Sequence, residues 1–303
     1  MTHCRESGNE AAKPINLRTP KSTSIHGTWN VRTMYQSSKA AIIANEMKQY
    51  NIEILGLSET RWISTGKTML ATGETILYSV HQEDGSPHTE GVAMMMSKEA
   101  NRALISWEPI SSRIITATFR TKHKRIRANF IQCYAPTNNA DENDKDNFYN
   151  TFNGIIIQQK DKDLTVLMGD FNAKIGNSNM GYEQSMGNHG LGQMNENGEQ
   201  FAEICANNKF VIGGSIFPHK RIHKATWVSP DHVTENQIDH FCISNKFRRS
   251  FQDVCVKRGA DAASDHHLLI GKIRMKLRKV YTMKHSSRVK YNVNFLREKT
   301  EKE

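Results

Sequence analysis

Cysteine is scarce in this sequence, and its five copies follow no metal-binding spacing. Cys4, Cys133, Cys205, Cys242 and Cys255 form neither a CxxC pair nor a Cys/His zinc pattern. Three of them fall in strand-like runs and Cys205 falls in a helix-like run, which is typical of buried free thiols in a reducing compartment. The cysteine pattern therefore argues against a zinc domain.

Long apolar runs are also missing. No run approaches the ~18 residues that a membrane-spanning helix needs. The first residues, MTHCRESGNEAAKP, lack the apolar core of a signal peptide. We therefore expect a protein that is not secreted and that has no membrane partner.

Positive charge is abundant, but it is distributed unevenly. Residues 272–303 carry 11 Lys/Arg against 3 Asp/Glu, whereas residues 25–271 are close to neutral. We interpret residues 279–303 as a basic tail, which is either a solvated linker or a nucleic-acid docking segment. The body has local basic clusters as well, at 122–125, 219–224 and 248–249.

The pattern along the chain predicts a flexible leader at 1–24 and one domain at 25–278. Apolar residues at helical spacing predict helices at 37–50, 144–159 and 196–207, with Ser37 or Ser38 capping the first. A glycine- and asparagine-rich stretch at 177–195 predicts a long loop. Strands are expected at 24–31, 53–58, 75–80, 91–97, 103–107, 113–120, 125–134, 164–168, 210–212, 225–229, 237–244, 251–257 and 267–275. Many short strands with few helices favour an α/β fold with two packed mixed or antiparallel β-sheets flanked by helices.

Polar residues stand at or near the ends of several predicted strands. Asn30, Glu59, Asp170 and Asn172 follow strands, Asp239 lies within NQIDHF, and Asp265 and His266 precede the last strand. Strand ends hold side chains rigidly, and carboxylate and amide oxygens are the ligands that Mg²⁺ prefers.

This pattern predicts phosphodiester hydrolysis. Asn30, Glu59 and Asp265 would bind the metal, and Asp170 would act as a base on water. Asn172 and His266 would donate to the phosphate, and Asp239 would fix the His266 tautomer. Each residue taken alone has another interpretation: a strand-end Asp can be a turn or cap residue, the His266–His267 pair can be a surface pair, and Trp227 can be a core residue.

Six motifs occur in one order: WN at 29–30, SET at 58–60, YAPT at 134–137, GDFNA at 169–173, QID at 237–239 and SDH at 264–266. Together they closely resemble the endonuclease/exonuclease/phosphatase superfamily over about residues 25–278. TWNVRTM, SETRW, QCYAPT and HGLGQMNENGEQF further resemble the endonuclease of non-LTR retrotransposons and the craniofacial development protein 2-like sequences.

The resemblance implies a four-layer, DNase I-like sandwich and a Mg²⁺-dependent (or Mn²⁺-dependent) endonuclease that nicks DNA. It implies the roles given above and adds Tyr134 as a donor to the phosphate. Arg32 stands where abasic-site repair members have an acid, so it is a candidate phosphate contact, as Trp227 is a candidate substrate contact. The chain is then expected to be a monomer that acts in the nucleus or the cytoplasm.

The reverse transcriptase that follows such domains has no counterpart in this sequence, which predicts a fragment, a truncated copy or a domesticated derivative. Two alternatives stay open. The same chemistry can serve RNA, lipid or inositol phosphate substrates, and a domesticated protein can bind nucleic acid without cutting it.

Overall fold

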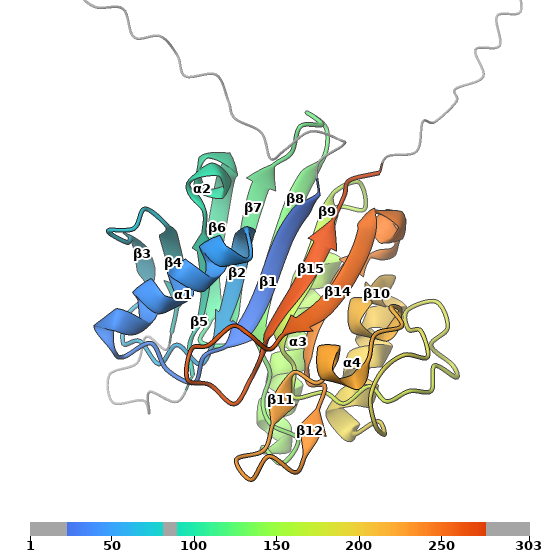
Figure 1. Ribbon diagram of the computed structural model, residues 1–303. Coiled ribbons are helices and arrows are strands. Elements are labelled where there is room, and N and C mark those ends of the chain that lie inside the picture. Colours follow the sequence, from blue (N-terminus) through green and yellow to red (C-terminus); the bar gives the residue numbers. More distant parts are fainter. Residues whose placement is uncertain (1–22, 81–89, 277–303) are drawn as a thin grey trace, which may run out of the picture.

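The computed structural model describes residues 23–80 and 90–276, which form two large β-sheets with helices on both outer faces (Figure 1). The predicted tail, Cys4 and most of the predicted leader lie outside the described residues.

The first sheet has its strands in the order β14-β15-β1-β2-β5-β4-β3. Their bounds are β14 Phe251–Lys257, β15 Leu268–Ile273, β1 Ser24–Asn30, β2 Ile52–Ser58, β5 Val92–Met96, β4 Thr75–Ser79 and β3 Gly66–Met69. Strands β1 and β2 are parallel and are joined through helix α1 (Ser37–Gln49), whereas the other neighbours are antiparallel.

The second sheet has the order β10-β13-β9-β8-β7-β6. Its strands are β10 Phe210–Ile212, β13 Asp239–Ser244, β9 Leu164–Asp170, β8 Arg127–Tyr134, β7 Ile114–Arg120 and β6 Leu104–Ser111. Here β8 and β9 are the parallel pair, joined through helix α3 (Glu142–Ile157). The remaining elements are α2 Lys98–Ala103, α4 Glu196–Asn207, η1 Gly213–Ser215, η2 Arg221–His223, β11 Trp227–Val228, β12 Glu235–Asn236 and η3 Asn245–Ser250.

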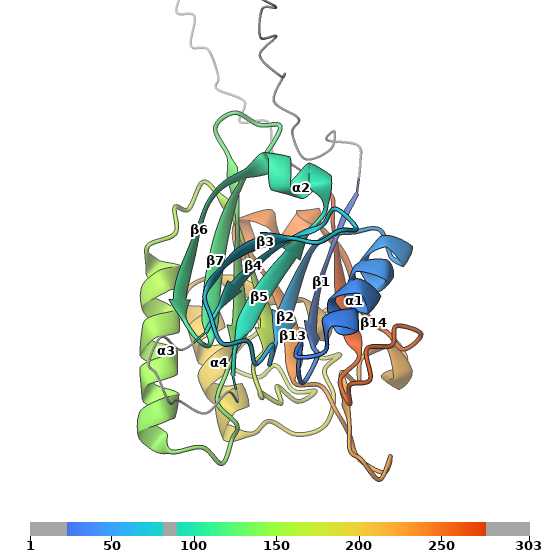
Figure 2. The same cartoon turned by 90° about the vertical axis from the view of Figure 1, so that its left-hand side faces the viewer.

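Three apolar cores separate four layers. One core lies between the two sheets, where Phe130 and Phe241 meet side chains of the first sheet. A second core packs Ile43 and Met47 of α1 against the outer face of that sheet. A third packs Phe152 of α3 and Phe201 of α4 against the other sheet. Figure 2 shows α1 on one side of the strands and α3 with α4 on the other. The predicted α/β sandwich of two mixed sheets flanked by helices is therefore confirmed.

The structure corrects several details of the predicted elements. Gln36 occupies the cap position of α1 without a side-chain cap hydrogen bond, so the predicted serine cap is wrong. Strand β3 and helix α2 were not predicted, because exposed GKTM has no apolar alternation and α2 is only 6 residues long. The four cysteines among the described residues are buried and free, as predicted. No helix in the described parts of the chain is long and apolar enough to cross a membrane.

The strand directions bring the predicted site residues to one end of the sandwich. Two parallel pairs, β1 with β2 and β8 with β9, end at this edge. Asp239 at the start of β13 lies directly opposite Asp170 at the end of β9. His266 lies just before β15, the antiparallel neighbour of β1. The fold thus places residues that are far apart in sequence at a common edge, next to β11 and β12 in Figure 1.

Candidate active site

Most of the predicted site residues form one cluster at this edge, joined by hydrogen bonds and by a 3.8 Å ion pair between His266 and Asp170. Its members are Asn30, Glu59, Tyr134, Asp170, Asn172, Asp239 and His266. Because both sheets contribute, the cluster exists only when the two sheets are packed together.

Asn30 is the bridge between the two sheets. Its Nδ2 donates to Glu59 Oε1 at 2.8 Å and to Asp170 Oδ2 at 2.9 Å. The Tyr134 hydroxyl also donates to Glu59 Oε1, at 3.1 Å. Two carboxylates from different sheets therefore converge on one buried amide, a concentration of oxygen ligands that suits a hard cation.

His266 lies between two acids. Its Nδ1 is 2.9 Å from Asp239 Oδ2, and its Nε2 is 3.8 Å from Asp170 Oδ2. Burial acts to lower the pKa of His266, but Asp239 and Asp170 outweigh burial and raise that pKa to about 9. Burial and the charge of Asp239 raise the pKa of Asp170 to about 7. One ligand atom from each of these three residues lies within 4.8 Å of the others, so the group could hold a metal ion.

The loop before β15 is tied to the end of β1 by two hydrogen bonds. The Trp29 indole donates to the His266 carbonyl at 2.9 Å, and the Ser264 hydroxyl donates to the Asn30 carbonyl at 2.7 Å. The WN and SDH motifs therefore act as one unit, in which each motif sets the position of the other.

The remaining predicted residues form a group beside this cluster. The Trp227 indole donates to Asp265 Oδ2 at 3.1 Å, and Arg32 lies 3.7 Å from the same oxygen. Asp265 Oδ1 is buried without a hydrogen-bond partner among the described residues. The backbone N–H of Arg32 donates to Asn30 Oδ1 at 3.0 Å, which joins this group to the cluster. Trp227 thus contacts the carboxylate of Asp265 and lies opposite His266 in an isolated β-bridge.

The backbone around the cluster is strained. Eight non-glycine residues in the described ranges have positive φ, and five of them border the site: Arg32 (58°), Glu59 (55°), Arg61 (56°), Asn172 (48°) and Ala263 (49°). Such a conformation costs about 1–3 kcal/mol per residue and persists only where surrounding contacts enforce it. Local propensity therefore does not explain these loops, whereas the hydrogen bonds of the site do.

Asn172 shows how one of these loops is enforced. Its backbone N–H donates to Asp170 Oδ1 at 3.0 Å, and its side chain donates to the Ala135 carbonyl at 3.0 Å. Its own carbonyl accepts from the side chains of Asn195 at 3.3 Å and Asn197 at 3.4 Å.

Asn197 and His240 extend this restraint, and the sequence analysis did not select either. Asn197 is fully buried and also donates to the Pro136 carbonyl at 2.9 Å, so it joins the Tyr134 loop to the Asn172 loop. Burial lowers the pKa of His240 to about 4, and its neutral ring donates Nε2–H to the Ala173 carbonyl at 2.7 Å. The polar NEN run at the start of α4 is the signal that could have identified Asn197.

Two arginines beside the cluster were also missed. Arg61 pairs with Glu59 at 2.9 Å. Arg113 lies with its guanidinium carbon 5.3 Å from the centre of the Tyr134 ring and also pairs with Glu90. Arg61 stands in SETRW and Arg113 begins the 113–120 run, and neither position carried a periodic signal, so only the packed structure reveals them.

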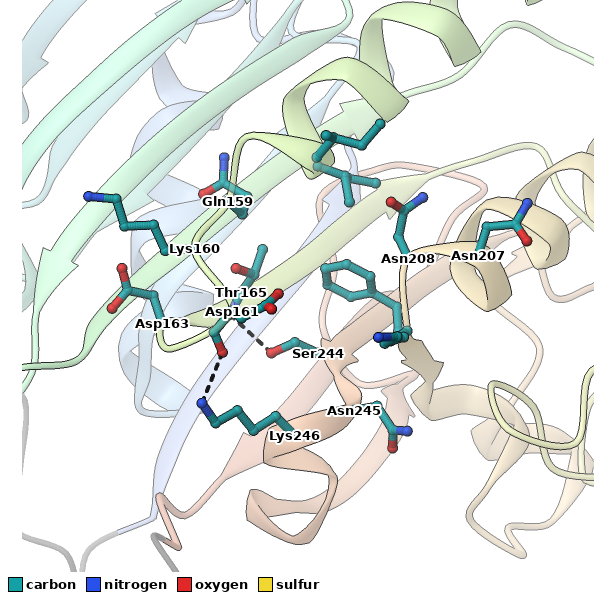
Figure 3. Close-up of a pocket in the computed structure, with 14 residues that line it drawn as sticks. Gln159, Lys160, Asp161, Asp163, Thr165, Asn207, Asn208, Ser244, Asn245 and Lys246 are labelled. Carbon is teal, nitrogen blue, oxygen red and sulfur yellow. Dashed lines mark hydrogen bonds between the residues drawn. The ribbon is translucent and has the colours of Figure 1, made fainter.

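A pocket of about 510 Å³ lies at the other end of β9, where its lining includes Thr165, Asn208 and Lys246 (Figure 3). Strand β9 runs from this pocket to Asp170, so the pocket is separate from the cluster. None of the predicted site residues therefore lines this pocket.

Comparison with known proteins gives a family and close relatives. The sequence profile of the Endonuclease/Exonuclease/phosphatase family matches residues 27–266. The chain is 35% identical over 274 residues to craniofacial development protein 2 of Bos taurus, and 34% identical over 264 residues to that of Tragulus javanicus. These matches cover 90% and 86% of this chain but 44% of each relative, so the chain spans less than half of their length.

Solved structures share the fold at low identity. The endonuclease domain of TRAS1, a telomere-specific non-LTR retrotransposon, matches with a TM-score of 0.59 at 14% identity and covers 84% of this chain and 100% of its own. The AP endonuclease LMAP of Leishmania major matches with 0.62 at 12%, covering 86% and 90%. The 3'-5' exonuclease NExo of Neisseria meningitidis matches with 0.56 at 16%, covering 82% and 99%. These neighbours show the fold, and the family match supports a hydrolase of phosphate esters.

Proposed function

Because this chain belongs to the endonuclease/exonuclease/phosphatase family, we propose that it is a Mg²⁺-dependent phosphodiester hydrolase that nicks DNA. The observation that carries the proposal is the contact of Asn30 with both Glu59 and Asp170, beside the His266–Asp239 pair. It unites an oxygen-rich metal-binding group, a base and a cationic donor in one cluster.

The donor set fits a hard cation. Two groupings compete for it, and protonation decides between them. His266 has a pKa of about 9 and carries protons on both ring nitrogens near neutrality, so its ring offers no free nitrogen to a cation in the Asp170–Asp239–His266 group. We propose instead that Asn30 and Glu59 hold Mg²⁺, with Asp265 as a further metal or water contact. When bound there, Mg²⁺ or Mn²⁺ would offset charge on the leaving oxygen.

Asp170 is the proposed base. A pKa of about 7 balances proton affinity against the ionised fraction near neutral pH. The water oxygen forms a bond to phosphorus, the bond from phosphorus to the leaving oxygen breaks, and the water proton passes to Asp170. The leaving oxygen is then protonated from solvent. Asn172 orients the phosphate and the water in this scheme.

His266 and Tyr134 are the proposed donors to the phosphate oxygens. Asp239 holds His266 in its charged form, which stabilises the extra negative charge of the transition state. Burial raises the pKa of Tyr134 far above its ordinary value, so its hydroxyl stays protonated and can donate. Arg32 and Trp227 are the proposed substrate contacts, and both also contact Asp265 Oδ2.

Nicking of supercoiled plasmid tests the proposal directly. Wild-type protein should nick with Mg²⁺ or Mn²⁺ but not with EDTA. Asp170→Ala and His266→Ala should each lose about 10²–10⁴ in rate. Asp161→Ala, an exposed acid before β9, is the matched control and should cut normally.

Binding without cutting in either metal would replace the nuclease with a non-catalytic nucleic-acid-binding protein. Preferential cleavage of RNA or of inositol phosphate in a substrate panel would retain the chemistry and reject the DNA substrate.

The remaining parts of the proposal concern the biological setting. We propose an origin in a non-LTR retrotransposon, supported by the shared fold of the TRAS1 domain. Action in the nucleus, a reverse transcriptase partner in the parent element and a monomeric state stay predictions.

A further inference from the structure

Two loops run side by side next to the proposed site. The first, residues 31–36, follows Asn30, and the second, residues 59–64, begins with Glu59. The Met34 N–H donates to the Thr60 carbonyl at 2.9 Å, and the Trp62 indole donates to the Met34 carbonyl at 3.1 Å. The loops are therefore one joined surface attached to the proposed metal-binding residues.

This paired-loop surface (residues 31–36 and 59–64) has a fixed inner side and an apolar outer side. Met34 is buried, and the Trp62 ring packs edge-on against Tyr78 with centroids 4.9 Å apart. Their sequence neighbours point outward, with Tyr35 64% and Ile63 66% exposed. Single exposed apolar residues are common on protein surfaces. Tyr35 and Ile63, however, directly follow Met34 and Trp62, which are joined by a hydrogen bond, so both belong to the paired-loop surface.

The same surface carries two cations. The side chains of Arg32 and Arg61 are 55% and 38% exposed, and both residues have left-handed backbones. They are anchored by Asp265 and Glu59 at 3.7 Å and 2.9 Å. Guanidinium groups interleaved with exposed apolar side chains match a nucleic-acid strand, in which phosphates alternate with flat bases.

We propose that Tyr35 and Ile63 contact a base beside the cleaved phosphate, while Arg32 and Arg61 hold the phosphates around it. The inference rests on the proposed hydrolase function and narrows its substrate to DNA with an unpaired or unstacked base at the cut. A tyrosine ring stacks only on an open base face, and in an intact duplex both faces of each base are covered by neighbours. Ile63 can then occupy the gap that an unstacked base leaves.

To test this contact with a base, binding and cleavage are measured on DNA, and hydrolysis is measured on a small phosphodiester. The DNA substrate is a duplex that carries unpaired 2-aminopurine, and its fully paired counterpart is the comparison. The small substrate is bis(p-nitrophenyl) phosphate, which has no base. The variants are Tyr35→Ala and Ile63→Ser, and Ile42→Ala is the control because it is an exposed apolar residue on α1.

Wild-type protein should bind and cut the unpaired substrate better than the paired one. It should also quench the 2-aminopurine fluorescence on binding. Tyr35→Ala should weaken Kd for unpaired DNA about 5- to 150-fold and abolish the quenching. Ile63→Ser should have a smaller effect in the same direction. Both variants should hydrolyse the small diester at the wild-type rate, and Ile42→Ala should match wild type throughout.

The inference is overturned if Tyr35→Ala retains wild-type affinity and quenching, or if it slows both substrates equally. A wild-type protein that hydrolyses neither substrate would refute the proposed function. The fluorescence titration would then still decide whether Tyr35 contacts a base, so the two failures are distinguishable.

Discussion

Replacement of Asp239 by asparagine probes the charged state of His266 directly. Asn keeps the size of the side chain but removes the charge 2.9 Å from the His266 ring. The rise in the His266 pKa from 6.5 to about 9 corresponds to about 3 kcal/mol, at ~1.36 kcal/mol per pKa unit. Among the acids that raise this pKa, Asp239 has the largest effect, so Asp239→Asn should remove a large part of that energy.

The sign of the effect follows from the direction of the shift. A histidine whose folded-state pKa is raised contributes stability that is fully present below pH 6.5 and is lost as the pH rises through about 9. The free energy of unfolding of wild type should therefore exceed that of Asp239→Asn most at low pH. This difference in free energy should shrink by up to about 3 kcal/mol between pH ~6.5 and pH ~10. Asp170 titrates near 7, so the part of this change above pH ~8 belongs to His266.

Urea unfolding across this pH range, in EDTA, is the assay. Other groups titrate in both proteins and cancel in the difference. Asp161→Asn should give a curve parallel to wild type, since Asp161 lies in the exposed segment before β9. Parallel curves for wild type and Asp239→Asn above pH ~8 would mean that Asp239 does not hold the proton on His266.

Three further predictions test other parts of the site. Mg²⁺ at about 100 times its Kd should stabilise the protein against unfolding by about 2.7 kcal/mol, and Glu59→Gln should lose this response in a thermal melt. Asn197→Ala should lower kcat about 10-fold or more with DNA affinity retained, because it releases the Tyr134 and Asn172 loops without touching substrate. Asn208→Ala, at the other end of α4, is its control. An equal loss of kcat in both variants would contradict the role of Asn197. Gly169→Ala should prevent soluble expression, since its Cβ would lie 2.1 Å from a β8 carbonyl at φ +149°; Gly154→Ala, with open space around its Cβ in α3, should express normally.

Prediction from sequence succeeded where a residue's position depends on its own strand. The run LTVLM ends abruptly before Asp170, and the structure confirms a buried strand there. Asn30 ends β1 in the same way. Apolar alternation and run length encode such strand ends locally, so two packed sheets with polar groups at their edges could be inferred from sequence.

Several features depended on contacts that no local pattern encodes. Asn30 reaches Asp170 across 140 positions of sequence, and only the packing of one sheet on the other sets that distance. Asn197 reads as an ordinary polar residue at a helix start until α4 docks against the Asn172 loop. The left-handed backbone at Glu59 is likewise imposed by its surroundings.

The sequence by itself therefore determined which residue types stand at which strand ends, and with them the class of fold and of chemistry. Tertiary structure alone decided which of those groups touch, which are protonated and which arginines lie beside the site. The physical reason is that periodicity records burial within one element. Hydrogen bonds and pKa shifts instead depend on distances of a few ångströms between different elements.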